Sequence, residues 1–140
     1  MKIALDVMGT DYGPSELVLG AVMAVKEYGC DVVLVGDEPT IRELLKKYGA
    51  ENDPHLLVQH ASQVIDMSEH PGIAVKTKKD ASIVVATDLL RNKECDALVS
   101  SGSTGAAVAA ALFHLGRIKG VSRPAIATPI PRLTGTTVLL

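Results

Sequence analysis

Aromatic side chains are scarce in this sequence, as are cysteines and long hydrophobic runs. Tryptophan is absent, phenylalanine occurs once, and aromatic residues make up 3% of the 140 residues. Few side chains are therefore available to stack on single-stranded nucleic acid. The formal net charge of -2 offers no basic surface for a phosphate backbone. We expect no nucleic-acid partner.

The two cysteines, Cys30 and Cys95, are far apart in the chain and form no Cys-x-x-Cys pair. This spacing gives little support to a disulfide or a zinc site, and no carboxylates and histidines have the spacing of metal ligands. The longest apolar run, 106–113, is far shorter than the roughly 20 residues that cross a bilayer. Asp6 and Asp11 interrupt the region where a signal peptide would be apolar. We expect a cytoplasmic protein without a metal, and contact with a membrane surface stays open.

Short runs rich in Val, Ile and Leu alternate with segments of helical period, which is typical of a parallel sheet wrapped by helices. The chain has 47% hydrophobic residues and is long enough for one core, so we predict a single α/β domain over residues 1–140. The predicted strands are 2–6, 31–36, 55–60, 96–100, 124–128 and 136–140. The first predicted helix, 14–28, starts at Pro14 and is ended by Gly29, and the second has its apolar stripe over 41–48 and is ended by Gly49. The third, 80–92, has Asp80 as its N-cap, and the fourth covers 104–115.

Two parts of the chain have weaker patterns. The stretch 62–79 shows little periodicity, and we predict a mobile loop there. The last residues, 137–140, form a strand-like run that no turn or helix follows. Two interpretations are equally open: the sequence stops inside a fold that continues, or a short edge strand closes the domain.

The candidate site lies in the loops that follow the strands, because ligands of a doubly wound sheet bind beyond the carboxyl ends of its strands. After the first strand, Gly9 and Gly13 let the backbone approach a ligand, and Asp11 is placed to cap the next helix. After the fourth strand, the loop Ser100-Ser101-Gly102-Ser103-Thr104-Gly105 opens directly into an alanine-rich helix.

This second loop has the features of an anion site. Free backbone N–H groups and the positive end of the helix dipole attract anions, and hydroxyl groups add donors. The loop is neither a Walker A motif nor a dinucleotide fingerprint. An equally open alternative is an N-capped helix whose glycines only permit close packing. The candidate phosphate-binding residues are Gly9, Thr10, Asp11, Ser101, Gly102, Ser103, Thr104 and Gly105.

A bound phosphate requires countercharge, and basic residues occur in the weakly periodic stretch and after the fourth helix. Arg123 is distinctive because Pro124 fixes an extended backbone behind it, and the planar guanidinium suits bidentate phosphate contact. His60, at the end of the third strand, is a candidate acid or base near neutral pH. No Ser-His-Asp arrangement is evident. The candidate catalytic residues are Arg123, Lys79 and His60, and the other basic candidates are Lys76, Lys78, Arg117 and Lys119.

Four ordered segments of the chain resemble the PlsX-type phosphate acyltransferases. Residues 1–11 are similar to the family's opening Lys-Ile-Ala-x-Asp-Ala-Met-Gly-Gly-Asp, and residues 100–106 are similar to its Ser-Ala-Gly-Asn-Thr-Gly-Ala. Residues 67–71 together with 78–82 form a third match, and residues 116–125 match almost residue for residue. The sequence departs from the family pattern at Thr10, Tyr12, Thr77, Ala81 and Ser103, where the family usually has Gly, His, Arg, Ser and Asn.

The resemblance implies a three-layer α/β/α enzyme with a mostly parallel sheet, related in fold to phosphotransacetylases and to isocitrate and isopropylmalate dehydrogenases. The implied reaction transfers a long acyl chain from acyl carrier protein to inorganic phosphate, giving acyl phosphate for phospholipid synthesis without a cofactor. A homodimer at the membrane surface is implied too. Two alternatives are another enzyme of this fold, such as a phosphotransacetylase, and a non-catalytic fragment that binds phosphate.

Overall fold

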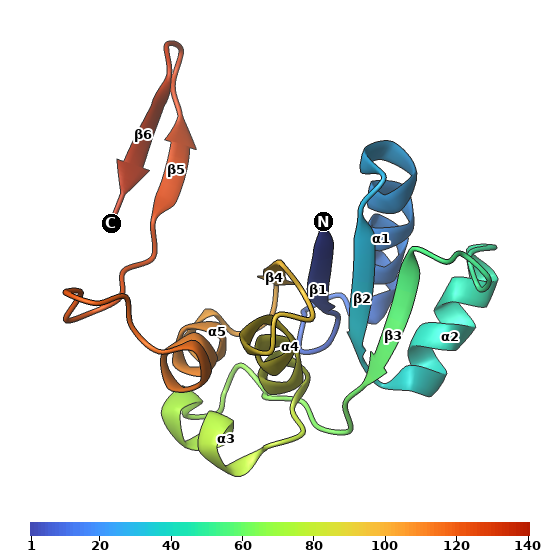
Figure 1. Ribbon diagram of the computed structural model, residues 1–140, viewed down its shortest axis with the longest axis horizontal. Helices are drawn as coiled ribbons and strands as arrows, with labels where there is room; N and C mark the ends of the chain where they lie inside the picture. The colour runs from blue at the N-terminus through green and yellow to red at the C-terminus, as the bar shows by residue number, and fades with distance from the viewer.

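A parallel four-stranded sheet forms the centre of the protein. The computed structural model describes all 140 residues, and the strand order is β3-β2-β1-β4 with every neighbouring pair parallel (Figure 1). The carboxyl ends of these strands therefore lie at one edge of the sheet, and the loops that follow β1 and β4 leave that edge side by side. The strands are β1 (Lys2–Asp6), β2 (Asp31–Gly36), β3 (Leu56–His60) and β4 (Ala97–Ser100).

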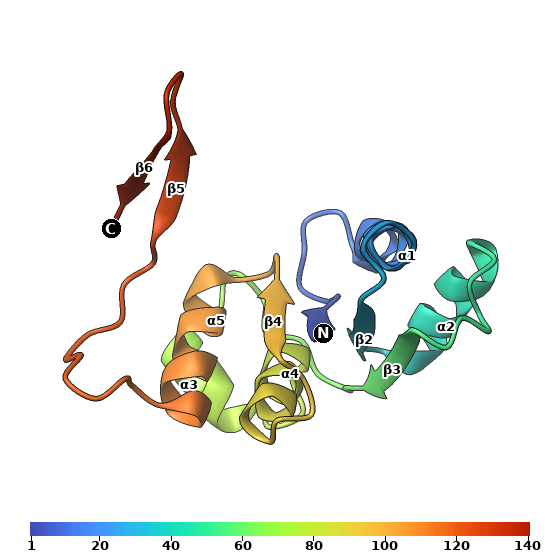
Figure 2. The same cartoon turned by 45° about the horizontal axis from the view of Figure 1, so that its top comes forward.

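Helices cover both faces of the sheet, which confirms the predicted three-layer α/β/α fold. Successive strand residues point to opposite faces, so Leu34 packs with Val18 and Ile41 on one face, whereas Val35 packs with Ala86 on the other. Figure 2 shows α1 and α4 on opposite sides of the row of strands. The helices are α1 (Pro14–Tyr28), α2 (Glu38–Lys47), α3 (Pro71–Thr77), α4 (Ser82–Arg91) and α5 (Thr104–Ala110), and a π-helical turn, η1 (Ala111–Leu115), follows directly.

A second core joins α3, α4 and α5 beside the sheet. Val75, Val84 and Ala110 are almost completely buried there. Small side chains such as Ala106 and Ala109 allow the helices to approach closely. This packing sets the beginning of α3 against the beginning of α5.

The predicted boundaries of α1 are confirmed. Pro14 occupies the first turn, where its missing N–H is no loss. Gly29 adopts the left-handed conformation, with φ 63°, and its N–H donates to the carbonyl of Val25 at 3.0 Å. Helix α2 buries Ile41 and Leu45 of the predicted apolar stripe, and it begins at Glu38 because the Asp37 carboxylate accepts from the Thr40 N–H at 3.1 Å and caps the helix.

Three local predictions are wrong. The stretch 62–79 contains the helix α3, which the sequence pattern did not reveal. Asp80 does not cap α4, since Ala81 is the N-cap residue and the Asp80 carboxylate instead accepts from the Ser62 N–H at 2.7 Å. Asp11 does not cap α1, whose N-cap is Gly13 and which has no side-chain cap.

The chain beyond η1 leaves the sheet. The predicted strand 124–128 lies instead at β5 (Thr128–Pro131) and pairs antiparallel with β6 (Thr136–Leu139), not with the central sheet. Gly135, with φ 87°, and the bond from the Arg132 N–H to the Gly135 carbonyl, 3.0 Å, form the tight turn that favours this hairpin. Figure 1 shows the hairpin well away from β4. None of the helices is both long and apolar enough to span a bilayer.

Candidate functional site

The two loops identified in the sequence meet at the carboxyl ends of adjacent strands. Asp6, the last residue of β1, is in register with Ser100, the last residue of β4. The segment 7–13 and the segment 101–105 therefore leave the sheet as neighbours. Ligands of open α/β sheets bind at such a place.

The first loop is shaped by two glycines with positive φ, Gly9 at 70° and Gly13 at 71°. The Thr10 hydroxyl donates to the carbonyl of Gly13 at 3.0 Å, which closes the loop on itself. A Cβ on Gly9 would lie 3.3 Å from the carbonyl oxygen of Ile65. The turn thus needs glycine for its conformation and for its close packing.

The second loop packs directly on the first. A Cβ on Gly102 would lie 3.3 Å from the carbonyl oxygens of both Met8 and Gly9. Ser103 caps α5, because its Oγ accepts from the Ala106 N–H at 3.3 Å. The two interpretations of this loop, an N-capped helix and close packing at a glycine, are both true of the structure, and neither prevents an anion from binding at the remaining amides.

A hollow of about 240 Å³ lies against the first loop and the first turn of α1, and the second loop borders it at Ser101. Its lining contains the exposed Tyr12 and the exposed Ser101. Below it, between the loops and the sheet, lies a space of about 10 Å³ bounded by Asp6, Ser82 and Gly102 among others, which is about the size of one water molecule.

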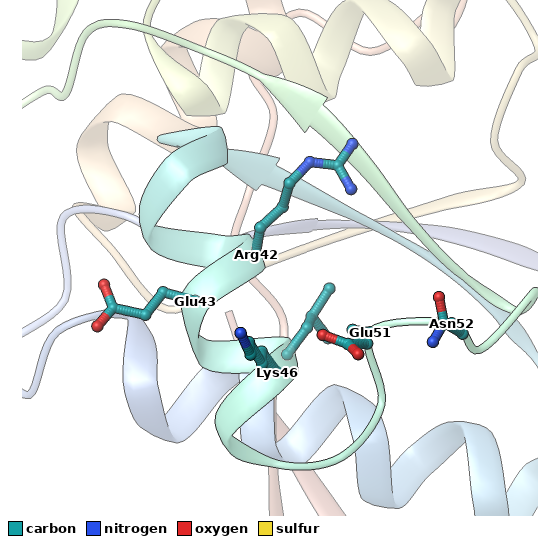
Figure 3. A pocket seen from close by; sticks show the side chains of 6 residues that line it. Arg42, Glu43, Lys46, Glu51 and Asn52 are labelled. Carbon is teal, nitrogen blue, oxygen red and sulfur yellow. The ribbon is translucent and has the colours of Figure 1, made fainter.

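The largest hollow of the molecule, about 450 Å³, lies elsewhere, on α2 and the turn after it. Figure 3 shows its side chains, with Arg42 and Glu43 directed away from each other. Arg42 Nε forms an ion pair with Glu38 Oε1 at 2.6 Å, and the Arg42 side chain is 62% exposed. We place the candidate site at the two loops, because the charged groups on α2 do not converge on a common point.

Asp6 is a site residue that the sequence analysis did not identify. It is 3% exposed, and its carboxylate accepts from the Ser100 hydroxyl at 2.8 Å and from the Met8 N–H at 3.2 Å. Burial raises the pKa of Asp6, while hydrogen bonding by Ser82, Ser100 and Met8 opposes the shift. The available signal was a carboxylate ending an apolar strand, at the edge where ligands bind.

The three lysines of the α3 region have different surroundings. Lys78 Nζ donates to Glu69 Oε1 at 2.6 Å and to the Val64 carbonyl at 2.8 Å, so it fastens the segment before α3. Lys76 Nζ lies 4.6 Å from the centre of the Phe113 ring. Lys79 is exposed and makes no hydrogen bond or ion pair.

Arg123 and His60 are not brought into contact with the two loops. Arg123 lies in the exposed segment between η1 and β5, makes no hydrogen bond, and lines neither of the two spaces at the site. His60 ends β3, an edge strand that β2 and β1 separate from β4. Its Nδ1 accepts from the Glu38 N–H at 3.2 Å, at the start of α2.

The fold defines the chain as a three-layer α/β protein in which two glycine-containing loops meet at the carboxyl ends of neighbouring parallel strands. A sequence model of the family described as "Fatty acid synthesis protein" matches residues 1–140, and the chain belongs to this family.

Proteins named phosphate acyltransferase are similar to the chain along its length, which confirms the resemblance found in the four motifs. The one from Pelotomaculum thermopropionicum is 54% identical over 140 residues, which cover 100% of this chain and 40% of that protein. The one from Dictyoglomus turgidum is 53% identical over 134 residues, covering 96% and 40%, and the one from Leptospira biflexa is 47% identical over 140 residues, covering 100% and 41%. The chain thus spans about two fifths of the length of these relatives.

Proposed function

We propose that the complete protein is a phosphate acyltransferase, which transfers a long acyl group from acyl carrier protein to inorganic phosphate and forms acyl phosphate for phospholipid synthesis. The family and the names of the relatives support acyl transfer to phosphate. Acyl carrier protein as the donor, a homodimer and contact with a membrane surface belong to this proposal.

One observation carries the assignment of the site: two loops from neighbouring strands are packed so closely that a Cβ on Gly102 would lie only 3.3 Å from two backbone carbonyl oxygens of the first loop. Gly102 faces the carbonyl oxygens of Met8 and Gly9, and the amides of Ser103, Thr104 and Gly105 that follow it have no acceptor within the chain. Backbone N–H groups held in this way bind an oxyanion without reorganising. In our proposal, the loop 101–105 holds the phosphate, and Gly9, Thr10 and Asp11 form the opposite wall.

The proposed chemistry is direct attack of a phosphate oxygen on the carbonyl carbon of the thioester. A tetrahedral intermediate forms, the C–S bond breaks, and the thiolate of the carrier leaves as the acyl phosphate is released. The enzyme's contribution is to hold the two reactants in line and to stabilise negative charge on the carbonyl oxygen. The hollow beside Ser101 and Tyr12 is the place from which the thioester would approach.

We assign countercharge for the phosphate to Lys79 and Arg123 on their charge alone, because both are exposed without an intramolecular partner and neither lines the two spaces at the site. Lys78 is excluded from this role because Glu69 and the Val64 carbonyl occupy its ammonium group. His60 is less suited to act as the acid or base, since it lies at the far strand of the sheet and accepts a hydrogen bond from α2.

The test uses a chimaera in which residues 1–140 are followed by the remaining part of the Pelotomaculum relative. Acyl phosphate formation is measured from acyl carrier protein thioester and inorganic phosphate. We expect turnover that saturates with phosphate. A chimaera that is folded by circular dichroism but forms no acyl phosphate, while the intact relative does, contradicts the proposed function of these residues.

A further inference from the structure

Asp6 is a buried acidic residue without a basic partner. No Lys, Arg or His lies within salt-bridge distance of it, and its neighbours are hydroxyl and amide groups only. Burying an unpaired carboxylate is unfavourable. Groups of this kind are concentrated at functional sites, where such a penalty is tolerated.

The hydrogen bonds of Asp6 link the two loops of the candidate site. One carboxylate oxygen, Oδ1, accepts from the Met8 N–H in the first loop, at 3.2 Å. The other, Oδ2, accepts from the Ser100 hydroxyl at 2.8 Å. Ser100 Oγ in turn accepts from the Gly102 N–H at 3.3 Å, in the second loop. A continuous set of hydrogen bonds therefore runs from Met8 through Asp6 and Ser100 to Gly102.

The Gly102 bond and the cap of α5 together leave three amides of the second loop free. The Gly102 N–H is directed back to Ser100 and the Ala106 N–H to Ser103. The amides between them have no acceptor within the chain. Small movements of the Gly102 peptide would redirect these amides, and a positional error of about 1 Å at a reacting group can cost roughly a hundredfold in rate.

We propose that Asp6 and Ser100 are positioning residues, which hold the loop 101–105 against the first loop so that its free amides face the phosphate. This inference rests on the proposed function. A carboxylate suits the role because one oxygen accepts from Met8 and the other from Ser100, beside a further hydrogen bond with Ser82, whereas an amide has one acceptor oxygen. Ser100 suits it because a hydroxyl donates to Asp6 while it accepts from Gly102.

The test measures phosphate KM, thioester KM and thermal midpoint in the chimaera for Asp6→Asn, Ser100→Ala and the double variant. Removing one such hydrogen bond is expected to raise phosphate KM about tenfold and to leave thioester KM unchanged. The double variant should be no worse than the stronger single variant, because both act through Gly102. Ser100→Thr keeps the hydroxyl and should restore most of the phosphate affinity.

Asp31→Asn and Ser62→Ala are matched controls. Asp31 begins β2, at the end of the strand away from the candidate site, and its Oδ1 is hydrogen-bonded to His55 Nδ1 at 2.7 Å. The Ser62 hydroxyl donates a hydrogen bond to the Asp80 carboxylate. Neither should change phosphate KM. If Asp6→Asn and Ser100→Ala lower the thermal midpoint but leave phosphate KM as it is, their role is structural only and the proposal is wrong. If the unsubstituted chimaera neither binds nor uses phosphate, the proposed function fails and the positioning role fails with it.

Discussion

Replacing Gly102 by alanine tests the close contact of the two loops. The added Cβ would lie 3.3 Å from two carbonyl oxygens, those of Met8 and Gly9, which is closer than the roughly 3.5–4.0 Å of an unstrained non-bonded contact. Both oxygens belong to the backbone, so the loops themselves must separate by a few tenths of an ångström. Gly102 does not have a positive φ, and the effect therefore comes from this contact.

We expect the Gly102→Ala chimaera to lose about 1–3 kcal/mol of unfolding free energy through overpacking. Its phosphate KM should rise about tenfold, because a shift of a few tenths of an ångström is a fraction of the 1 Å error that costs about a hundredfold. Urea denaturation measures the first quantity, and initial rates of acyl phosphate formation at varied phosphate measure the second.

Gly20→Ala is the matched control, because no atom lies within 4 Å of the Cβ that it would add in the middle of α1. It should stabilise the protein by up to about 1 kcal/mol and leave phosphate KM unchanged. If Gly102→Ala destabilises the protein while phosphate KM stays as it is, the glycine serves packing alone. Phosphate binding then does not depend on the close contact of the two loops.

Further predictions concern the core, the buried carboxylate and the basic residues. Leu34→Ala, at a fully buried position of β2, should lower the unfolding free energy by about 2–5 kcal/mol in urea titrations. The raised pKa of Asp6 means that the folded state holds its proton more tightly than the unfolded state. Its contribution to stability should therefore fall as pH rises from about 3.9 through the folded pKa, and Asp6→Asn should flatten the measured pH profile over that range. Lys78→Met should cost at most about 1 kcal/mol, since the Lys78–Glu69 pair is partly exposed, but it should speed amide hydrogen exchange before α3. Arg123→Lys should raise phosphate KM more than it lowers the thermal midpoint, because a point charge does not reproduce a planar fork; an unchanged KM would remove Arg123 from the site.

The central strands β1 and β2 could be predicted because they are mostly buried and contain short runs of apolar residues. The edge strands β3 and β4 also contain short apolar runs, although several of their residues are exposed. Pro14 and Gly29 marked the limits of α1 for reasons local to the backbone. The segment around α3 was missed because a helix of seven residues is too short to show a period. The hairpin of β5 and β6 was missed because an apolar run does not indicate which strand it pairs with.

The two loops of the candidate site could be picked out from the sequence, but the contacts between them could not. Gly9 and Gly102 stood out by residue type, yet their contact follows from the register of β1 with β4, which a single sequence does not reveal. The hydrogen bonds of Asp6 have the same origin, since Asp6 and Ser100 are 94 positions apart. The sequence does not distinguish Lys78 from Lys79, whereas the structure shows that only Lys78 forms an ion pair, with Glu69.

Phosphate binding where the two loops meet is tested most directly by titrating the ¹⁵N-labelled 140-residue chain with inorganic phosphate and following the amide chemical shifts. We predict saturable shifts of the amides in 9–11 and 101–105, with smaller shifts on α2 and on the hairpin. Chloride at matched ionic strength serves as the control. Shifts confined to other segments, or equal shifts with chloride, would contradict the claim that phosphate binds where the two loops meet.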